Sequence, residues 1–476
     1  TGTAGKIAAN SSITDYSKAF IGCASNVTCY GGIITLKADR LDLTDAGAGA
    51  DSQPSIRVGG TGVLVIQAND AATSIGVGSG AGDLSVRQAD IDAFRDGVSS
   101  ITIGQSGGSG TVTVSNAAFK DNVTIQGGTA AVTISGALST GTDTGAGTTA
   151  VTTKGLLTIS ATVTTQNQDI TLTADRLDLT GTVDAGTATA TLTTATAARA
   201  IDLGSTTNAA SALEISDAEL DRVTAGTLRI GSSSAGAISV TQAISLANSN
   251  TLHLRSGAGI SQSAAITVTS LAVTAGDAVA LASANNAVTS FAASTGASNA
   301  NVAFRDDAGF AIGTVDGVAG ASLGTGSLTL TSTGAVTQSA AISAGGLALT
   351  GTGGAYTLAH ASNAVSTIAA NTGTVDVGLS GAASIGTVGS VTGITATGTV
   401  KLTSGGNLTI ASGAAVSASG TGDALVLAAS GTFTNNGGAS ALSVAGGGRF
   451  LVFSISPLTS STGGVAALPY YNRAFT

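Results

Sequence analysis

The sequence lacks the residues with which most globular domains build large cores and charged surfaces. It has no Trp and no Met, three Pro, two Cys and two His, and charged residues make up 9% of its 476 positions, against about 25% in a typical soluble domain. Val, Ile, Leu and Thr are nevertheless plentiful, whereas disordered chains combine high net charge with few apolar residues. Together with the 68 Gly, this composition predicts a folded chain with a narrow interior built from small residues.

The same scarcities exclude several functional classes. The net charge is −9 and Lys and Arg form no cluster, so we expect no nucleic-acid binding, which depends on such clusters. Ser, Thr and Gly interrupt every apolar run before it reaches the length of about 18 residues that a membrane span requires. The two histidines, His253 and His360, lie far apart on segments that resemble ordinary strands. We expect each to be exposed or to face a turn, and we predict no catalytic triad, no metal site, no cofactor and no enzymatic activity.

Acidic residues gather at two places, each beside apolar residues and an arginine. We interpret both groups as solvated turns in which Arg95 or Arg222 neutralises the carboxylates, with a calcium or glycan site as the alternative. The two groups are Asp90, Asp92 and Asp96, and Asp217, Glu219 and Asp221.

A long duplication organises the second half of the chain. Residues 250–268 return as residues 326–344 at an offset of 76, so that Leu252 corresponds to Leu328. Self-similarity at such a period indicates one supersecondary unit that is stacked many times. Two further pairs of segments follow the same duplication, 285–293 with 362–370 and 311–320 with 384–393.

The first half of the chain is also duplicated, with a longer unit. The block ADRLDLT occurs at residues 38–44 and again at 174–180, and residues 83–104 match residues 212–231. The repeat architecture therefore extends over most of the sequence.

These units predict short strands separated by Gly-rich turns. Apolar and polar residues alternate over stretches rich in Val, Ile, Leu and Thr, which is typical of strands. A helix is disfavoured because each Gly costs it about 1 kcal/mol relative to Ala, and propeller blades need aromatic signatures that are missing here. The offset of 76 equals four times 19, which is close to one turn of a three-faced parallel β-helix. We therefore predict an all-β parallel β-helix (β-solenoid) of roughly 20 turns.

The ends of the chain differ from the repeats. We predict an N-terminal cap over residues 1–30, β-solenoid repeats over 31–449 and an extended C-terminal tail over 450–476. A solenoid exposes its core and unpaired strands at both ends, which must be capped or docked. Cys23 and Cys29 lie close together in a chain with no other cysteine. We expect a disulfide and hence an oxidising compartment, with two small buried thiols as the alternative.

With these motifs the chain resembles the filamentous haemagglutinin-like exoproteins of bacteria. The resemblance rests on the ADRLDLT blocks, LEISDAELDRVTAGTLRIG, the repeated GAVTQSAAIS and IGTVDGV segments and GGGRFLVFSISPLTSSTGG, and it covers most of residues 31–465. The family implies a large, secreted, right-handed β-helical protein that is exported by two-partner secretion. This sequence lacks the family's N-terminal secretion domain and its long C-terminal region, which fits a mature, processed segment.

We predict a non-enzymatic structural or adhesive β-solenoid that is secreted by a bacterium and lies outside the cell or at its surface. Its expected partners are further copies of itself, joined head-to-tail into an extracellular filament, and host or neighbouring-cell surfaces or glycans. A carbohydrate-active parallel β-helix enzyme or a glycan-binding module is the alternative. Aromatic residues concentrate at both ends, where they either plug the caps or form the head-to-tail docking surface. These residues are Tyr16, Phe20, Tyr30, Phe450, Phe453, Tyr470, Tyr471 and Phe475.

Overall fold

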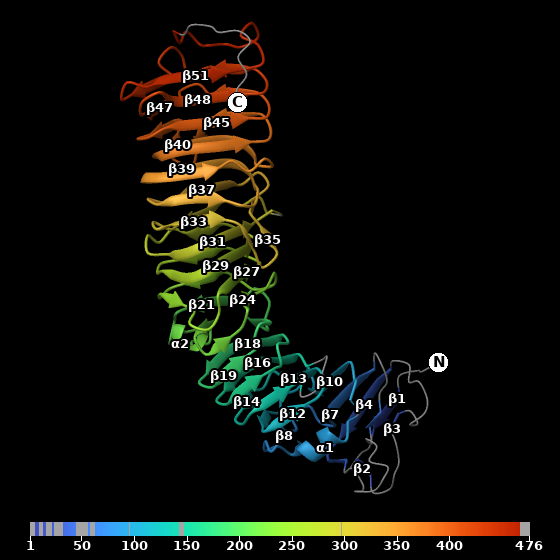
Figure 1. Ribbon diagram of the computed structural model, residues 1–476. Coiled ribbons are helices and arrows are strands. Elements are labelled where there is room, and N and C mark those ends of the chain that lie inside the picture. Colours follow the sequence, from blue (N-terminus) through green and yellow to red (C-terminus); the bar gives the residue numbers. More distant parts are fainter. Residues whose placement is uncertain are drawn as a thin grey trace. The chain divides into compact units, whose positions relative to one another are not determined.

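The computed structural model contains two compact units, each built from stacked strands (Figure 1). Unit 1 comprises residues 1–236 and 245–250, and unit 2 comprises residues 237–244 and 251–476. The residues that the structure describes are 5–8, 13–15, 21–22, 32–43, 56–57, 62–94, 96–141, 147–296 and 298–466.

Nearly all regular structure in the described residues is β-strand, from β1 (Gly5–Ala8) to β51 (Arg449–Phe453). Two short helices in unit 1, α1 (Gln88–Asp92) and α2 (Asp217–Leu220), interrupt the strands. The chain winds through about 16 turns, and the strands of successive turns pair in parallel. The predicted all-β parallel β-solenoid is thus confirmed. Among the described helices, none is long and apolar enough to cross a membrane.

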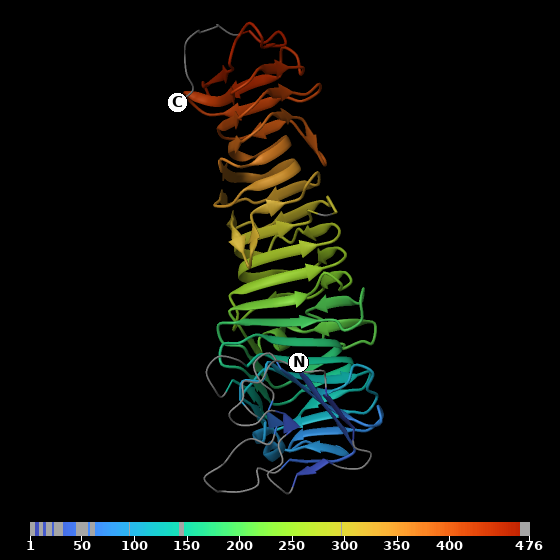
Figure 2. The same cartoon turned by 90° about the vertical axis from the view of Figure 1, so that its right-hand side faces the viewer.

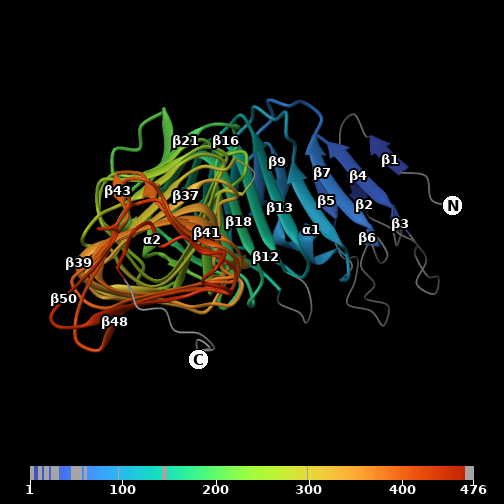
Figure 3. The same ribbon diagram turned by 90° about the horizontal axis from the view of Figure 1, so that it is seen from above.

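In unit 1 the strands of successive turns form ladders on different faces of the solenoid. The strands β1, β4 and β7 lie side by side (Figure 3). They begin the longest ladder, which consists of β1, β4 (Ile33–Ala38), β7 (Val63–Ala68), β10 (Ser100–Gly104), β13 (Val123–Gly128), β16 (Thr149–Ile159), β18 (Ile170–Leu179), β20 (Thr189–Thr193) and β24 (Thr227–Gly231). Another consists of β12 (Ala117–Phe119), β15 (Leu138–Thr140), β17 (Thr162–Thr164), β19 (Thr182–Asp184) and β23 (Val223–Thr224).

Unit 2 continues the same architecture, with its strands stacked one above another (Figure 2). One ladder consists of β28 (Ile260–Gln262), β30 (Val279–Leu281), β32 (Val302–Arg305), β37 (Ser327–Thr331), β39 (Ile342–Leu358), β40 (Ala364–Leu379), β41 (Ala383–Ile385), β46 (Leu408–Ile410) and β49 (Phe433–Asn435). Another contains β27 (Thr251–Ser256), β29 (Ile266–Ala275) and β31 (Ala287–Ser294). This second ladder continues through β33 (Gly309–Ile312), β38 (Ala335–Gln338), β39, β40, β45 (Val400–Ser404) and β48 (Asp423–Ala429) to β51.

The duplication in unit 2 spans three turns and one further face, rather than the predicted four turns. Starting from Ile260, the ladder passes through Val279 and Val302 to Leu328, whose counterpart in the sequence is Leu252. Leu328 therefore stacks on the ladder of Ile260, one face further along the chain than Leu252. The predicted turn length of 19 residues was too short, because the connecting loops lengthen many turns beyond that value. The predicted number of turns, roughly 20, was therefore too large.

Alternation along each strand explains the core. Residues at every second position point to the same face of a strand, and in β10 and β13 the inward side chains Ile101 and Val123 lie directly above one another, both buried. Such files of Leu, Ile and Val fill the interior of both units. In unit 2 the rings of Phe291 and Phe304 stack at 4.0 Å within this interior, and burial of such aromatic pairs is strongly stabilising.

A pair of amide side chains, a partly exposed Gln and a buried Asn, recurs in both copies of the unit 2 duplication. The amide nitrogen of Gln262 donates to Oδ1 of Asn286 at 2.7 Å, and Gln338 donates to Asn363 in the same way. The same asparagine oxygens accept the backbone N–H of Ile266 and Ile342, each at 2.9 Å. The repeated Gln and Asn thus join adjacent turns by bonds that the hydrophobic core cannot supply.

Candidate functional site

Two of the eight aromatic residues predicted at the docking surface fall within the part of the chain that the structure describes. Phe450 and Phe453 lie on β51, and both are half-buried. The predicted boundary between repeats and tail, at residue 450, therefore falls inside a paired strand. The other predicted residues lie outside the described residues: Cys23, Cys29, Tyr16, Phe20, Tyr30, Tyr470, Tyr471 and Phe475.

Among the described residues, the last strand of unit 2 has an open edge. β51 pairs with β48, and no strand among the described residues pairs with its opposite side. Apolar side chains are unusually exposed on it and just after it, since Val452 is 37%, Ile455 73% and Leu458 89% exposed. An unpaired strand edge beside exposed apolar side chains is a template for pairing with another chain.

One carboxylate in each acidic group is a tether within the fold, so the prediction of solvated turns is wrong for Asp90 and Glu219. Asp90 is fully buried, and its two carboxylate oxygens accept the backbone N–H of Leu43 at 2.6 Å and that of Arg87 at 2.9 Å. Glu219 occupies the equivalent place in the second copy, where it accepts the N–H of Leu179 at 3.0 Å and that of Ser216 at 2.8 Å.

This tether links the two separate motifs of the first duplication. Leu43 and Leu179 each belong to an ADRLDLT block, and each carboxylate comes from the first turn of the short helix that follows later in the chain. Asp90 also contacts the Arg87 guanidinium at 3.1 Å. Asp90 first, and Asp42 second, raise the pKa of Arg87 above its ordinary value.

The remaining acidic side chains of the second group bind the next turn of unit 1. Oδ1 of Asp217 accepts the N–H of Ser245 at 2.6 Å, and Oδ1 of Asp221 accepts that of Ala247 at 3.0 Å. In the first group, Asp92 accepts from Gln88. Across the described residues, no group of three or more His, Cys, Asp or Glu side chains is placed to hold a metal ion.

Of the two arginines predicted to neutralise the acidic groups, Arg222 lies within the described residues. Arg222 donates through Nη1 to the carbonyl oxygen of Thr180 at 3.0 Å, at the end of the second ADRLDLT block. Arg95 lies outside the described residues. In the first group it is Arg87, which the sequence did not single out, that pairs with the buried carboxylate of Asp90.

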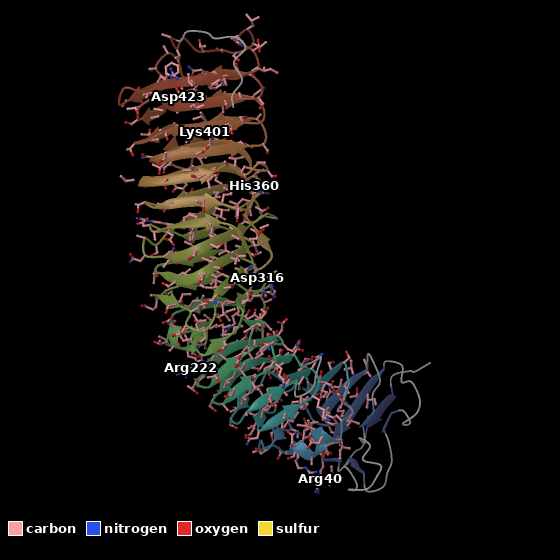
Figure 4. All side chains as sticks on the ribbon, viewed as in Figure 1. Arg40, Arg222, Asp316, His360, Lys401 and Asp423 are labelled. Atoms are coloured by element: carbon pink, nitrogen blue, oxygen red, sulfur yellow. The ribbon has the colours of Figure 1, made fainter. Side chains whose placement is uncertain are left out.

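His253 is buried and hydrogen-bonded, so the expectation that it is exposed is wrong, whereas the alternative holds in that it faces the turn that carries Asp316. It is 5% exposed, with Nδ1 at 2.6 Å from Oδ2 of Asp316 and Nε2 at 2.9 Å from Oγ1 of Thr274. His360 is partly exposed and accepts the backbone N–H of Ser362 at 3.1 Å. Asp316 and His360 lie on different turns of unit 2 (Figure 4).

The order carboxylate, imidazole and hydroxyl at His253 has the connectivity of a hydrolytic triad. Hydrolysis also needs an open approach to the hydroxyl and donors aimed at an oxyanion. The side chains of His253 and Asp316 are only 7% and 10% exposed, so the contact between them joins the loop that carries Asp316 to β27. The sequence could not show it, because Asp316 lies 63 positions after His253.

A second buried carboxylate, Glu214, gathers hydrogen bonds from one loop of unit 1. It lies on β22 (Ala212–Ile215), and its Oε2 accepts from Ser205 at 3.0 Å and from Thr207 at 2.6 Å. Burial by itself raises the pKa of Glu214, but the bonds from Thr207, Ser205 and the backbone N–H groups of residues 208 and 209 outweigh it and lower the pKa below 4.5. The ionised carboxylate thus holds the loop against the solenoid.

We predict that Glu214→Gln destabilises unit 1 by about 1–2 kcal/mol at pH 7, because hydrogen bonds to a charged acceptor are the stronger ones. A carboxyl group whose pKa is lowered by folding stabilises the folded state above its unfolded pKa. That contribution is lost as the pH falls below about 4.5 and through the folded pKa. Urea denaturation of the wild type and of the variant at pH 7 and at pH 3.5 measures the difference. Thr207→Val, which removes one donor, should give a smaller loss, and a difference between wild type and Glu214→Gln that grows towards low pH would contradict the prediction.

A shallow depression of about 420 Å³ lies among three strands near the end of unit 2. Its walls carry only small, uncharged side chains, which offer neither an acid nor a base for catalysis. The lining residues are Ala396, Thr397, Ser417, Ala418, Ser419, Ser443, Val444 and Ala445. The open edge at β51 is therefore the stronger candidate site.

No family of known proteins, no curated protein and no solved structure matches this chain. What it shares with β-helical exoproteins is the fold, since its described residues form a parallel β-solenoid with almost no helix.

Proposed function

We propose that this chain is a secreted structural or adhesive β-solenoid of the filamentous haemagglutinin-like kind, and a subunit of an extracellular filament that assembles head-to-tail. The observation that carries the proposal is the edge of β51 that no other described strand covers, with Val452, Ile455 and Leu458 exposed beside it. A surface of this kind is removed from water most effectively when another strand pairs with it.

The polarity of a parallel ladder favours a second copy of this chain as the occupant. At the other end of the strand order, β1 pairs with β4, and no second strand among the described residues pairs with β1. The first and last strands of a parallel ladder expose different edges. The last strand of one subunit can therefore pair in parallel with the first strand of the next subunit. Such a contact is heterologous, and repeating it produces an open filament and not a closed dimer.

The composition also supports a scaffold. Between Asp316 and Asp376 the sequence contains no Asp, Glu, Lys or Arg, so long stretches of the surface are uncharged and similar from turn to turn. The resemblance of the repeated motifs to haemagglutinin-like exoproteins adds the expectation of secretion and of a location at the cell surface. Glycans or neighbouring cell surfaces are proposed as further partners of such a fibre.

The alternative, a carbohydrate-active enzyme or glycan-binding module, would require carboxylates that face a groove and are available to a substrate. The buried side chains of Asp90 and Glu214, and the partly buried one of Glu219, instead accept hydrogen bonds from their own fold. These contacts favour the structural function.

We predict that the purified chain forms end-to-end filaments, visible by negative-stain electron microscopy, and that Val452→Lys, Ile455→Lys and Leu458→Lys together leave single subunits. Three charged side chains at the edge oppose strand pairing and the burial of apolar surface. Deletion of residues 457–476 should also abolish assembly while the solenoid stays folded.

The matched control is Thr267→Lys, which places one charge on an exposed position of β29, away from the last strand. It should leave the filaments unchanged. Filaments that persist in the triple variant, or in the deletion, would refute head-to-tail docking at this edge, and single subunits in the wild type would refute self-assembly.

A further inference from the structure

Unit 2 carries two antiparallel hairpins that are inserted into otherwise continuous turns. The first pairs β34 (Thr314–Val315) with β35 (Val318–Ala319), and the second pairs β42 (Thr387–Val388) with β43 (Val391–Thr392). The residues just before and just after each hairpin pair with the same strand of the preceding turn, β31 for the first hairpin and β40 for the second. In the first, Phe291 pairs with Ile312 before the excursion and Ala293 pairs with Ala321 after it.

Both hairpins rest on outward-facing alanines of the solenoid. Val315 packs on Ala272 and Ala292, with Val318 beside them. Leu271 and Val273 are fully buried, so by alternation Ala272 points away from the interior, and it is buried because the hairpin covers it. The second hairpin repeats the arrangement, with Val388 and Val391 on Ala348 and Ala369.

The two hairpins differ at their tips and on the strand beneath. In the first, Oδ2 of Asp316 lies 2.6 Å from Nδ1 of His253, and the two side chains are 10% and 7% exposed. In the second copy, Gly389 stands in place of Asp316 and Thr329 in place of His253. The registers agree, since His253 pairs with Ala272 and Thr329 with Ala348.

We propose that the Asp316–His253 contact is a latch that holds the first hairpin closed over the solenoid. The second hairpin packs on the equivalent alanines but has no counterpart of this contact, so it opens far more readily. His253 faces outward between the inward-facing Leu252 and Leu254, where an unengaged imidazole would be in water. Asp316 instead reaches it from the hairpin tip, and Thr274 fixes the other ring nitrogen at 2.9 Å.

The backbone at the tip supports the comparison. Asp316 has a φ of 45° and Gly389 a φ of 59°, so both tips use the left-handed region, in which Asp is better tolerated than most residues. A Cβ added at Gly389 would meet no atom within 4 Å. The second hairpin can therefore accept an aspartate, which makes it possible to build the latch there.

Hydrogen–deuterium exchange followed by mass spectrometry tests the proposal on the full chain, because backbone amides exchange when local structure opens. Peptides over residues 313–320 should exchange at least tenfold more slowly than those over 386–393. His253→Thr, which copies Thr329, and Asp316→Gly, which copies Gly389, should each abolish that difference. The double variant Thr329→His with Gly389→Asp should slow the second hairpin to the rate of the first.

The second hairpin also serves as an internal folding control, because its exchange should stay unchanged in the His253→Thr and Asp316→Gly variants. Equal exchange of the two hairpins in the wild type would overturn the latch. An unchanged first hairpin in His253→Thr would also overturn it, even if Asp316→Gly accelerates exchange, since Asp316 would then act through other contacts. A double variant that fails to slow the second hairpin would show that the pair is not sufficient as a latch.

Discussion

Replacing Gly104 with Ala is expected to lower the free energy of unfolding of unit 1 by about 3–5 kcal/mol, since it combines backbone strain with a steric clash. Gly104 ends β10 with a φ of 98°, a conformation that side chains with a Cβ rarely adopt. It pairs with Gln126 on the next turn, and a Cβ at residue 104 would lie 2.0 Å from the carbonyl oxygen of Gln126. Because that atom belongs to the backbone, relief requires the two turns to separate.

Two glycines separate the contributions of strain and contact. Gly413 has a φ of 79°, but a Cβ added there would meet no atom within 4 Å, so Gly413→Ala should cost only about 1 kcal/mol through strain. Gly381 has neither a positive φ nor a neighbour within 4 Å, and Gly381→Ala should change stability by no more than about 0.5 kcal/mol. Urea denaturation followed by circular dichroism gives all three values, and equal losses would show that the close approach of the turns does not decide the effect.

Removing the Asp90 carboxylate is expected to destabilise unit 1 by about 3–5 kcal/mol, because it takes the acceptor from two backbone N–H groups, and each buried donor left unsatisfied costs about 1–3 kcal/mol. Asp90→Ala would leave the buried N–H of Leu43 without its 2.6 Å acceptor and deprive Arg87 of a backbone and a side-chain contact. Since the contact joins residues 47 positions apart, we expect exchange to accelerate both at α1 and at the strand that contains Leu43.

The second copy and a neighbouring residue supply the controls for Asp90. Glu219→Ala removes the equivalent tether to Leu179, but Glu219 is only partly buried and has no arginine at the position of Arg87, so the loss should be about 1–3 kcal/mol. Asp92→Ala, at an exposed position, should fall within about 0.5 kcal/mol of the wild type. A loss at Asp90 as small as that at Asp92 would refute the tether.

Alternation and self-similarity were sufficient to predict strands, a parallel β-solenoid and the correspondence between its copies. Both signals are local or periodic in the sequence, so the identity of Leu252 with Leu328 and the correspondence of Asp90 with Glu219 can be read without coordinates. The same correspondence could have pointed to the tether, because an acidic residue recurs after each ADRLDLT block. The number of turns could not be obtained in this way, because 76 residues fit four turns of 19 as well as three longer turns and a face.

The candidate site was predicted only in its position. The unusual residues lie at the end of the repeats, and the described part of that end includes Phe450 and Phe453 on β51. The most exposed apolar side chains, Ile455 and Leu458, were not singled out, because exposure depends on which strands pair and not on residue type.

The sequence by itself determined the architecture, since a strand period and a repeat leave few ways to bury so many small apolar residues. The tertiary structure alone decided which polar side chains face one another. His253 and Asp316, and likewise Asp90 and Leu43, are brought together by the number of residues in each turn. That number is set by loops whose lengths vary from turn to turn. No periodic signal in the sequence therefore shows which polar residues, many positions apart, come to lie on adjacent turns.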